Sequence, residues 1–293
     1  MRSDTPSFTA RWVAGMRGLG SYLPERLRLV DDPYGLRFSQ AVGPLLQVPA
    51  VAAGARATAP LWMQGYVRRF ALYMQLRTRV IDDDVEDFVR SGGKQIVLLG
   101  AGFDARAWRL AGLSSATVFE VDHPATQQTK RARMAGEATR GKVVFVPWDF
   151  EHESIRDLPA RLIAEGQDPA IPTMTVLEGV VMYLSGPALD ATFAAIAAYS
   201  APGSPLSVTY LKSELMQRYA PLQRARRAVV RWVGEPFRTG FEPARFESWL
   251  SARDFRLERD ESAGEAARRL LGLGARRSRR VQPLSRFALA RRI

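Results

Sequence analysis

Apolar residues follow two different patterns along the chain, and the change falls near residue 93. Before that point they recur every three to four residues, which is the spacing of an amphipathic helix. The clearest helix carries this spacing at Phe70, Tyr73, Leu76 and Val80. A glycine pair follows it and is typical of a helix end. We therefore predict a helical N-terminal cap over residues 1–93.

After the glycine pair, short runs rich in β-branched residues alternate with helical stretches. The runs cover residues 95–99, 117–121, 143–147, 173–177, 205–210, 255–259 and 285–290. Strands that alternate with helices predict a parallel α/β sheet. The last two runs are joined more closely, which favours an antiparallel edge. We therefore expect residues 94–293 to form an α/β domain with a seven-stranded, mostly parallel sheet.

The segment of about residues 212–245 is too long for a simple crossover between two strands, and it is interpreted as a helical insertion that acts as a lid. It contains Arg218, Arg224, Arg226, Arg227 and Arg231 beside Tyr219, Trp232 and Phe237. Cations and rings in a lid favour an anionic, ring-bearing ligand. The alternative for these arginines is a solvated helix face.

The first strand runs into "GAGFDA", a G-x-G-x-x-A turn that contains Gly100 and Gly102. Two glycines permit a tight turn and a close approach of the backbone to a ligand. Dinucleotide-binding and nucleoside-binding enzymes share this motif, and a glycine turn without a ligand is a further alternative. The ligand has to be inferred from the ends of the other strands, because ligands of such sheets lie beyond the carboxyl ends.

Carboxylates follow the second and third strands. Asp122 lies close to the offset of about 20 residues at which an acidic residue hydrogen-bonds a ribose diol. Asp149 and the flat, apolar Phe150 suit an adenine, since one accepts from the exocyclic amine and the other covers the ring. Each aspartate has a helix N-cap as its alternative.

Glu178 follows the fourth strand, where it could act as a general base, as a partner for a positive group, or as a structural salt-bridge residue. Together with Asp104, Asp122 and Asp149 it predicts an acidic rim around one mouth. Such a rim opposes the pyrophosphate of a dinucleotide. It suits S-adenosylmethionine, which brings an adenosine, an ammonium, a sulfonium and one carboxylate. An NAD-dependent oxidoreductase of Rossmann type remains the alternative.

Four segments resemble, in order and spacing, the leucine carboxyl methyltransferase-like family of S-adenosylmethionine-dependent O-methyltransferases. They are "QIVLLGAGFDARAWRL", "TVFEVDHPATQQTK", "VPWDFEHES" and "LEGVVMYL". The similarity covers roughly residues 30–290. It implies a class I methyltransferase, Rossmann-like fold. Because many bacterial members act in secondary metabolism, it also implies a small-molecule acceptor with a carboxylate or phenolic hydroxyl. Carboxyl methylation of a peptide or protein is the alternative.

The resemblance also implies which residues hold the methionine part of the cofactor. Arg77 would bind its carboxylate, with Arg79 as the second choice. The backbone at Gly100 and Glu178 would take its ammonium. An arginine supplies the cation that the acidic rim lacks.

For the adenosine part, the resemblance implies that Asp122 binds the ribose hydroxyls and that Asp149 and Phe150 bind the adenine. Gly102 completes the glycine turn beside them. No catalytic residue is assigned. Tyr183, Tyr210 and His123 are candidates for a base, and core tyrosines and a helix-start histidine are the alternatives.

Composition narrows the functional classes. The 293 residues include no cysteine and two histidines, which excludes thiolate sites and disfavours a metal centre. The net charge of +12 favours an acidic acceptor, or else a solvated basic surface. The densest basic patch, residues 275–280, lacks the interleaved aromatic residues of a nucleic-acid site. No apolar run reaches the length of a membrane span and no secretory signal is visible, so we expect a cytoplasmic protein.

Overall fold

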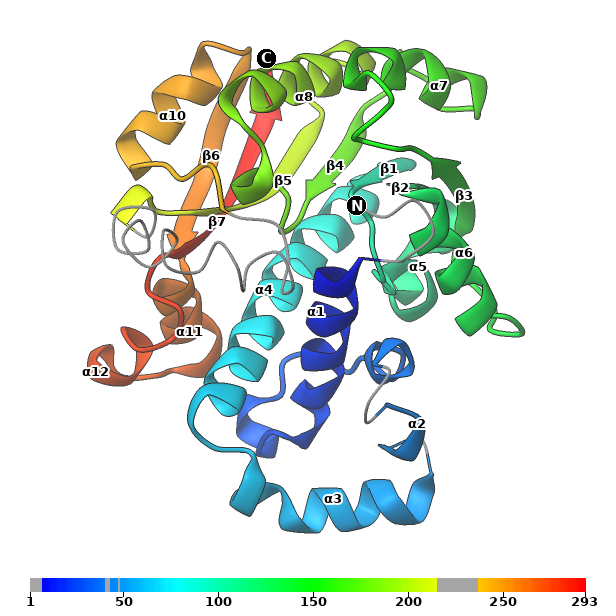
Figure 1. Ribbon diagram of the computed structural model, residues 1–293. Coiled ribbons are helices and arrows are strands. Elements are labelled where there is room, and N and C mark those ends of the chain that lie inside the picture. Colours follow the sequence, from blue (N-terminus) through cyan, green and yellow to red (C-terminus); the bar gives the residue numbers. More distant parts are fainter. Residues whose placement is uncertain (1–6, 40–42, 47, 215–236) are drawn as a thin grey trace.

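Seven strands form one sheet in the order β3-β2-β1-β4-β5-β7-β6, with helices on both faces (Figure 1). The computed structural model describes residues 7–39, 43–46, 48–214 and 237–293. The strands are β1 (Gln95–Leu99), β2 (Thr117–Asp122), β3 (Lys142–Pro147), β4 (Thr173–Leu177), β5 (Pro205–Leu211), β6 (Phe255–Ser262) and β7 (Ser285–Arg292). Each of the seven strands predicted from the sequence is therefore confirmed.

Helices precede the sheet and connect its strands. The α-helices are α1 (Phe8–Gly18), α2 (Gly43–Leu46), α3 (Pro49–Trp62), α4 (Gly65–Arg90), α5 (Arg106–Arg109), α6 (Pro124–Arg133), α7 (Leu158–Ala164), α8 (Gly186–Tyr199), α10 (Pro243–Ser251), α11 (Ala263–Leu271) and α12 (Ala275–Ser278). Short 3₁₀ helices are η1 (Leu19–Tyr22), η2 (Glu25–Leu27), η3 (Gly35–Phe38), η4 (Ala111–Ser115), η5 (Ile155–Asp157) and η6 (Val181–Tyr183). The long helix predicted before the glycine pair is α4.

Strands β1 to β5 are parallel, and β7 runs antiparallel to both β5 and β6. This confirms the mostly parallel sheet with an antiparallel edge. Gln95 of β1 pairs with Thr117 of β2 and with Thr173 of β4, so these strands start in step. The strand order reverses between β1 and β4, and a crevice opens at such a switch point beyond the carboxyl ends.

The central strands β1 and β4 are buried on both faces of the sheet, because helices cover each face. In β1, Val97 and Leu99 join the core under α7, α8 and α10, while Ile96 and Leu98 join the core under α4 and α5. Strands buried on both faces are continuous apolar runs rather than alternating ones. This is the physical reason why "QIVLL" and "TMTVL" could be recognised as central strands.

Helix α4 links the predicted cap to the sheet. Its Leu76 and Val80 pack with α1, α3 and α11, whereas Ile81 and Val85 pack with residues of β1, β2 and β4. Figure 1 shows α4 and α1 side by side, with α3 at the end of the cap far from the sheet. The apolar core therefore continues across residue 93, where the sequence pattern changes.

Only the two ends of the predicted lid belong to the described residues, and positions 215–236 with their arginines lie outside them. At the far end, the Arg238 N–H donates to the Met182 carbonyl oxygen at 2.7 Å. The Phe237 ring centroid lies 5.5 Å from that of Tyr183. The described end of the predicted lid therefore contacts η6, in the connection that follows β4. Of the helices in the described ranges, none is long and apolar enough to span a membrane.

Candidate functional site

Residues predicted to bind the cofactor follow four neighbouring strands. Gly100 follows β1, Asp122 ends β2, Asp149 comes two residues after β3, and Glu178 follows β4. Because these strands are parallel and adjacent, the four positions lie at one edge of the sheet, at the switch point. The structure thus places these predicted residues together.

The glycine turn requires its glycines. Gly100 has a φ of 75°, and a Cβ on it would lie 2.7 Å from Cγ2 of Val180. Gly102 has a φ of 52°, and its N–H donates to Oδ2 of Asp122 at 2.6 Å. A side chain at Gly100 would combine a strained backbone with a clash. The turn therefore remains a narrow backbone surface between β1 and the loop after β4.

A buried ion cluster lies beside the glycine turn, on the side of β1 and β4. We use this name for Arg77, Asp82, Asp104, Arg106, Arg109 and Glu178. Arg106 is at its centre, with Nε 2.8 Å from Oδ1 of Asp82 and Nη1 2.8 Å from Oε2 of Glu178. The same Nη1 also contacts the Asp104 carboxylate. Arg109 donates to both oxygens of Asp82 at 2.6 and 2.9 Å. Three arginines thus face three carboxylates.

Arg77 joins this cluster from helix α4. Its Nε lies 2.6 Å from Oε1 of Glu178, and its guanidinium carbon lies 5.8 Å from the centroid of the Tyr73 ring. The second choice, Arg79, has a half-exposed side chain and pairs with Asp83 at 2.8 Å on the helix surface. Of these two arginines, only Arg77 is in contact with a strand-end residue of the site.

The ion cluster changes the electrostatic picture expected from the sequence. Burial alone would raise the pKa of Glu178, but Arg77 and Arg106 outweigh that effect and hold the pKa well below its usual range. The Asp104 side chain is 9% exposed and is paired with Arg106. The predicted acidic rim is therefore neutralised on this side, because arginines from α4 and α5 reach its carboxylates.

Two carboxylates, Asp122 and Asp149, lie on the other side of the glycine turn, at the end of β2 and just after β3. We call them the loop carboxylates. Asp122 accepts the Gly102 N–H at 2.6 Å and the His123 N–H at 2.8 Å. Burial raises its pKa, while these two N–H donors act in the opposite direction. No arginine or lysine forms an ion pair with Asp122 or Asp149 among the described residues.

Asp149 lies in the short loop after β3. Its Oδ1 accepts the Glu151 N–H at 2.9 Å, and its Oδ2 lies 2.8 Å from Nδ1 of His152. The hydrogen bond with His152 and the Glu151 N–H lower the pKa of the Asp149 carboxyl. The neighbouring Phe150 is 43% exposed. An exposed ring next to an ionised carboxylate is compatible with a planar base that donates an amine.

Of the three candidates for a base, His123 and Tyr210 form hydrogen bonds with other groups of the protein, and Tyr183 packs against another ring. Nδ1 of His123 accepts the Ala125 N–H at 3.2 Å and caps helix α6, as the helix-start alternative predicts. The Tyr210 hydroxyl is buried in the core and donates to Oδ2 of Asp260 at 2.6 Å. Burial, together with that hydrogen bond to Asp260, raises the pKa of Tyr210 far above its usual value. Tyr183 lies against Phe237 at the end of the insertion.

Sequence reasoning found Arg77, Asp104 and Glu178 but missed the other half of the ion cluster. Arg106 and Arg109 sit directly after the glycine turn in "GFDARAWRL", and Asp82 lies on α4. Arg17 of α1 also reaches the turn, where its Nη2 donates to the Phe103 carbonyl oxygen at 2.6 Å. The available signal was a run of arginines beside a predicted ligand turn, but no pattern paired them with particular acids.

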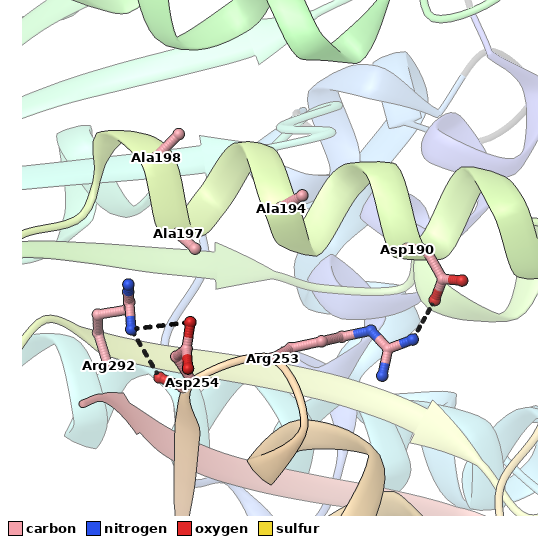
Figure 2. Close-up of a pocket in the computed structure, with 7 residues that line it drawn as sticks. All are labelled: Asp190, Ala194, Ala197, Ala198, Arg253, Asp254 and Arg292. Atoms are coloured by element: carbon pink, nitrogen blue, oxygen red, sulfur yellow. Dashed lines mark hydrogen bonds and ion pairs between the residues drawn. The ribbon is translucent and has the colours of Figure 1, made fainter.

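A hollow of about 370 Å³ lies away from these residues, at the other end of the parallel strands (Figure 2). Its rim carries two ion pairs, Arg253 with Asp190 at 2.6 Å and Arg292 with Asp254 at 3.6 Å. Arg291, next to Arg292, pairs with the first residue of β5, so this hollow is at the amino ends of the parallel strands. Ligands of such sheets bind at the carboxyl ends, so this hollow is not the predicted cofactor site.

No group of side chains that could hold a metal ion is present within the described ranges.

Comparisons with known proteins point to one family. The family described as leucine carboxyl methyltransferase matches residues 10–197. A relative from Mycolicibacterium smegmatis is 33% identical over 260 residues, which are 82% of this chain and 78% of that protein. A relative from Frankia alni is 32% identical over 78% of this chain and 76% of its own length. Both bear the name of an S-adenosyl-L-methionine-dependent methyltransferase.

Solved structures share the fold. A protein of the DUF574 family from Streptomyces avermitilis superimposes with a TM-score of 0.60, at 15% identity and over 100% of both chains. A protein from Thermobifida fusca, titled a methyltransferase, gives a TM-score of 0.59 at 18% identity, over 99% of this chain and 96% of that chain. These findings confirm the predicted fold and give no support to the oxidoreductase alternative. The chain belongs to the leucine carboxyl methyltransferase family of S-adenosylmethionine-dependent methyltransferases.

Proposed function

We propose that this enzyme methylates an oxygen atom of a small molecule, either a carboxylate or a phenolic hydroxyl, and that it does so in the cytoplasm during secondary metabolite biosynthesis. The observation that carries the choice of oxygen is the ion pairing of Glu178. Glu178, the carboxylate at the mouth of β4, is paired with Arg77 and Arg106 and is not free to act as a base. This favours an acceptor that ionises readily by itself.

The buried ion cluster fits the methionine part of the cofactor. The amino-acid end of this part has one ammonium and one carboxylate, so that end adds no net charge to a cluster in which three arginines balance three carboxylates. The sulfonium carries the one remaining positive charge of the cofactor. In our assignment, Arg77 binds the carboxylate, and the backbone at Gly100 and Glu178 accepts from the ammonium. A buried cluster that is already neutral favours a zwitterionic amino-acid group over a group of either net charge.

The loop carboxylates fit the adenosine part. Asp122 is assigned to the ribose hydroxyls, and Asp149 with Phe150 to the adenine. Both carboxylates lack a cationic side chain of lysine or arginine in the described residues, and charged acceptors form strong hydrogen bonds to hydroxyls and amines. The glycine turn at Gly100 and Gly102 brings backbone close to the ligand between these two sides.

When bound, the cofactor supplies a methyl group that its sulfonium has already activated. The work of the protein is then to align an oxygen nucleophile with that methyl group and to exclude water. The N-terminal cap, residues 1–93, and the insertion of about residues 212–245 are assigned to this task, because α1 and η6 flank the strand ends. Arg17 of α1 contacts the glycine turn, and Phe237 contacts η6 through Tyr183.

Glu178 is unsuited to deprotonate an acceptor. Its carboxylate is held by Arg77 and Arg106, and both arginines lower its pKa. An efficient general base has a pKa near the working pH. A carboxylic acid acceptor is ionised at neutral pH without help, and a phenol with a pKa of about 10 is the weaker candidate. The basic composition, with a net charge of +12, favours an acidic acceptor through its field.

The test is an acceptor screen with purified enzyme and S-adenosylmethionine labelled in its methyl group. Panels of aromatic and aliphatic carboxylic acids, phenols, amines and acidic peptides are compared, each with and without EDTA. We expect labelled esters or ethers of small acids or phenols, and rates that EDTA leaves unchanged. Transfer only to nitrogen or carbon, only to peptides, or only without EDTA would each contradict the proposal.

A further inference from the structure

Both histidines of this chain converge on one atom, Oδ2 of Asp149. His152 approaches it from the same loop, with Nδ1 at 2.8 Å, and its side chain is 75% exposed. His123 approaches from the loop after β2, with Nε2 at 3.5 Å, and its side chain is 11% exposed. Of the two, only His123 connects Asp149 to a different strand.

The orientation of the His123 ring is determined by its other nitrogen. Nδ1 accepts the Ala125 N–H at 3.2 Å, so it carries no proton in that arrangement. The proton of the neutral imidazole is therefore on Nε2, which is the atom that faces Asp149. At 3.5 Å the contact is an electrostatic one, longer than a full hydrogen bond. It nevertheless directs a positive N–H dipole at the carboxylate.

The backbone of the same residue holds the other loop carboxylate. The His123 N–H donates to Oδ1 of Asp122 at 2.8 Å, while Oδ2 of Asp122 accepts from Gly102. His123 thus contacts Asp122 through its main chain and Asp149 through its ring. Because it is also the N-cap of α6, its position is tied to the start of that helix.

We propose that His123 is a positioning residue for adenosine recognition. It holds the carboxylates of Asp122 and Asp149 at fixed positions relative to each other, so that they bind the ribose and the adenine of one adenosine together. This proposal rests on the assignment of Asp149 to the adenine in the proposed function. Without the His123 ring, Asp149 keeps only its contacts within residues 149–153. Its carboxylate is then held by the Glu151 N–H and by the exposed His152, and neither of these contacts fixes it relative to Asp122.

Two substitutions separate this role from helix capping. Asparagine is a good N-cap and has its oxygen at the position of Nδ1, but it is too short to reach Asp149. Glutamine is a poor N-cap, but its amide nitrogen can occupy the position of Nε2. His123→Asn should therefore retain thermal stability and lose the contact with Asp149, whereas His123→Gln should lower the melting temperature and retain the contact.

The experiment measures the dissociation constants of S-adenosylhomocysteine and of S-inosylhomocysteine, in which an oxygen replaces the exocyclic amine. A site that hydrogen-bonds an amine rejects the analogue that lacks it, so the wild type should prefer the adenosine form. Asp149→Asn should reduce that preference about tenfold, in keeping with the loss of a charged hydrogen bond. His123→Asn should reduce it about three- to tenfold at an unchanged melting temperature, and His123→Gln should preserve most of it.

The outcomes distinguish the assignment of Asp149 to the adenine from the positioning role of His123. If Asp149→Asn leaves the preference unchanged, the assignment of Asp149 to the adenine fails. If Asp149→Asn reduces it but His123→Asn does not, the proposed function stands and the positioning role is wrong. His152→Ala is the matched control, because it removes the exposed histidine from the same oxygen. A larger loss with His152→Ala than with His123→Asn would also contradict the role given to His123.

Discussion

The two sides of the site hold their charged groups in different ways. On the side of β1 and β4, the buried ion cluster pairs each carboxylate with an arginine, and the side chain of Arg106 is 3% exposed. On the side of β2 and β3, the loop carboxylates are held by backbone N–H groups and histidines, and the side chain of Asp149 is 24% exposed. The first side is built into the core, whereas the second lies at the end of β2 and in the short loop after β3.

From this difference we infer that the stability of the fold depends on the ion cluster, whereas the loop carboxylates matter mainly for ligand binding. A buried charge that loses its partner is costly, because no water replaces the partner. Removing a loop carboxylate leaves backbone N–H donors without an acceptor, which costs less than an unpaired buried charge. We therefore expect substitutions in the ion cluster to reduce stability, and substitutions of the loop carboxylates to reduce affinity while the fold persists.

The largest effect is expected for Arg106→Met. This change leaves Asp82, Asp104 and Glu178 with one arginine fewer in a buried site, and breaking a buried ion pair costs about 3–5 kcal/mol. The free energy of unfolding, measured by urea denaturation, should fall by that amount. Arg79→Met is the control, since its exposed pair with Asp83 contributes at most about 1 kcal/mol. Similar stabilities for both variants would remove the distinction between the two sides.

Asp122→Ala should have the next largest effect, and on affinity rather than stability. In the proposed function it removes charged hydrogen bonds to the ribose, each of which contributes about 1.5–3 kcal/mol. The dissociation constant of S-adenosylhomocysteine should rise about tenfold or more by calorimetry, with a cooperative melting transition retained. Asp87→Ala, an exposed acid at the end of α4, is the control. An unchanged affinity for Asp122→Ala would reduce Asp122 to a structural residue of the turn.

Arg77→Ala tests the other side with a ligand pair. The variant should weaken binding of S-adenosylhomocysteine about tenfold more than binding of 5′-methylthioadenosine, which lacks the amino-acid carboxylate. Glu178 retains Arg106 in this variant, so the fold should survive. Equal losses for the two ligands would mean that Arg77 only balances Glu178. The carboxylate would then require a different cation.

A change of pH should have a smaller effect on the affinity for S-adenosylhomocysteine, and that effect should come from Asp122 rather than from Glu178. Burial raises the pKa of Asp122, whereas Arg77 and Arg106 depress that of Glu178. Affinity that depends on ionised Asp122 is present above its folded pKa and is lost as the pH falls through it, before Glu178 is protonated. Binding of S-adenosylhomocysteine should weaken on acidification, by less than in Asp122→Ala. Asp122→Asn should flatten this dependence, and an equally steep profile in that variant would assign it elsewhere.

Much of the fold could be predicted from the sequence, because its signals are local. The central strands β1 and β4 are nearly continuous apolar runs, and Asp122, Asp149 and Glu178 stand at or just after strand ends. Parallel strands then bring those ends to one edge of the sheet by topology alone. The predicted cap and sheet, by contrast, share a core through Ile81 and Val85 of α4. An amphipathic helix pattern does not show which surface will cover its apolar side.

The strands, the glycine turn, the residues at the strand ends and the family could all be recognised from the sequence. The pairing of the charges became visible only in the folded protein. Arg106 contacts Asp82, 24 residues before it, and Glu178, 72 residues after it. His123 meets Asp149 across two strand-end loops. Such pairs depend on where helices pack on the sheet, and every buried charge must find a partner within a few ångströms there because water is excluded.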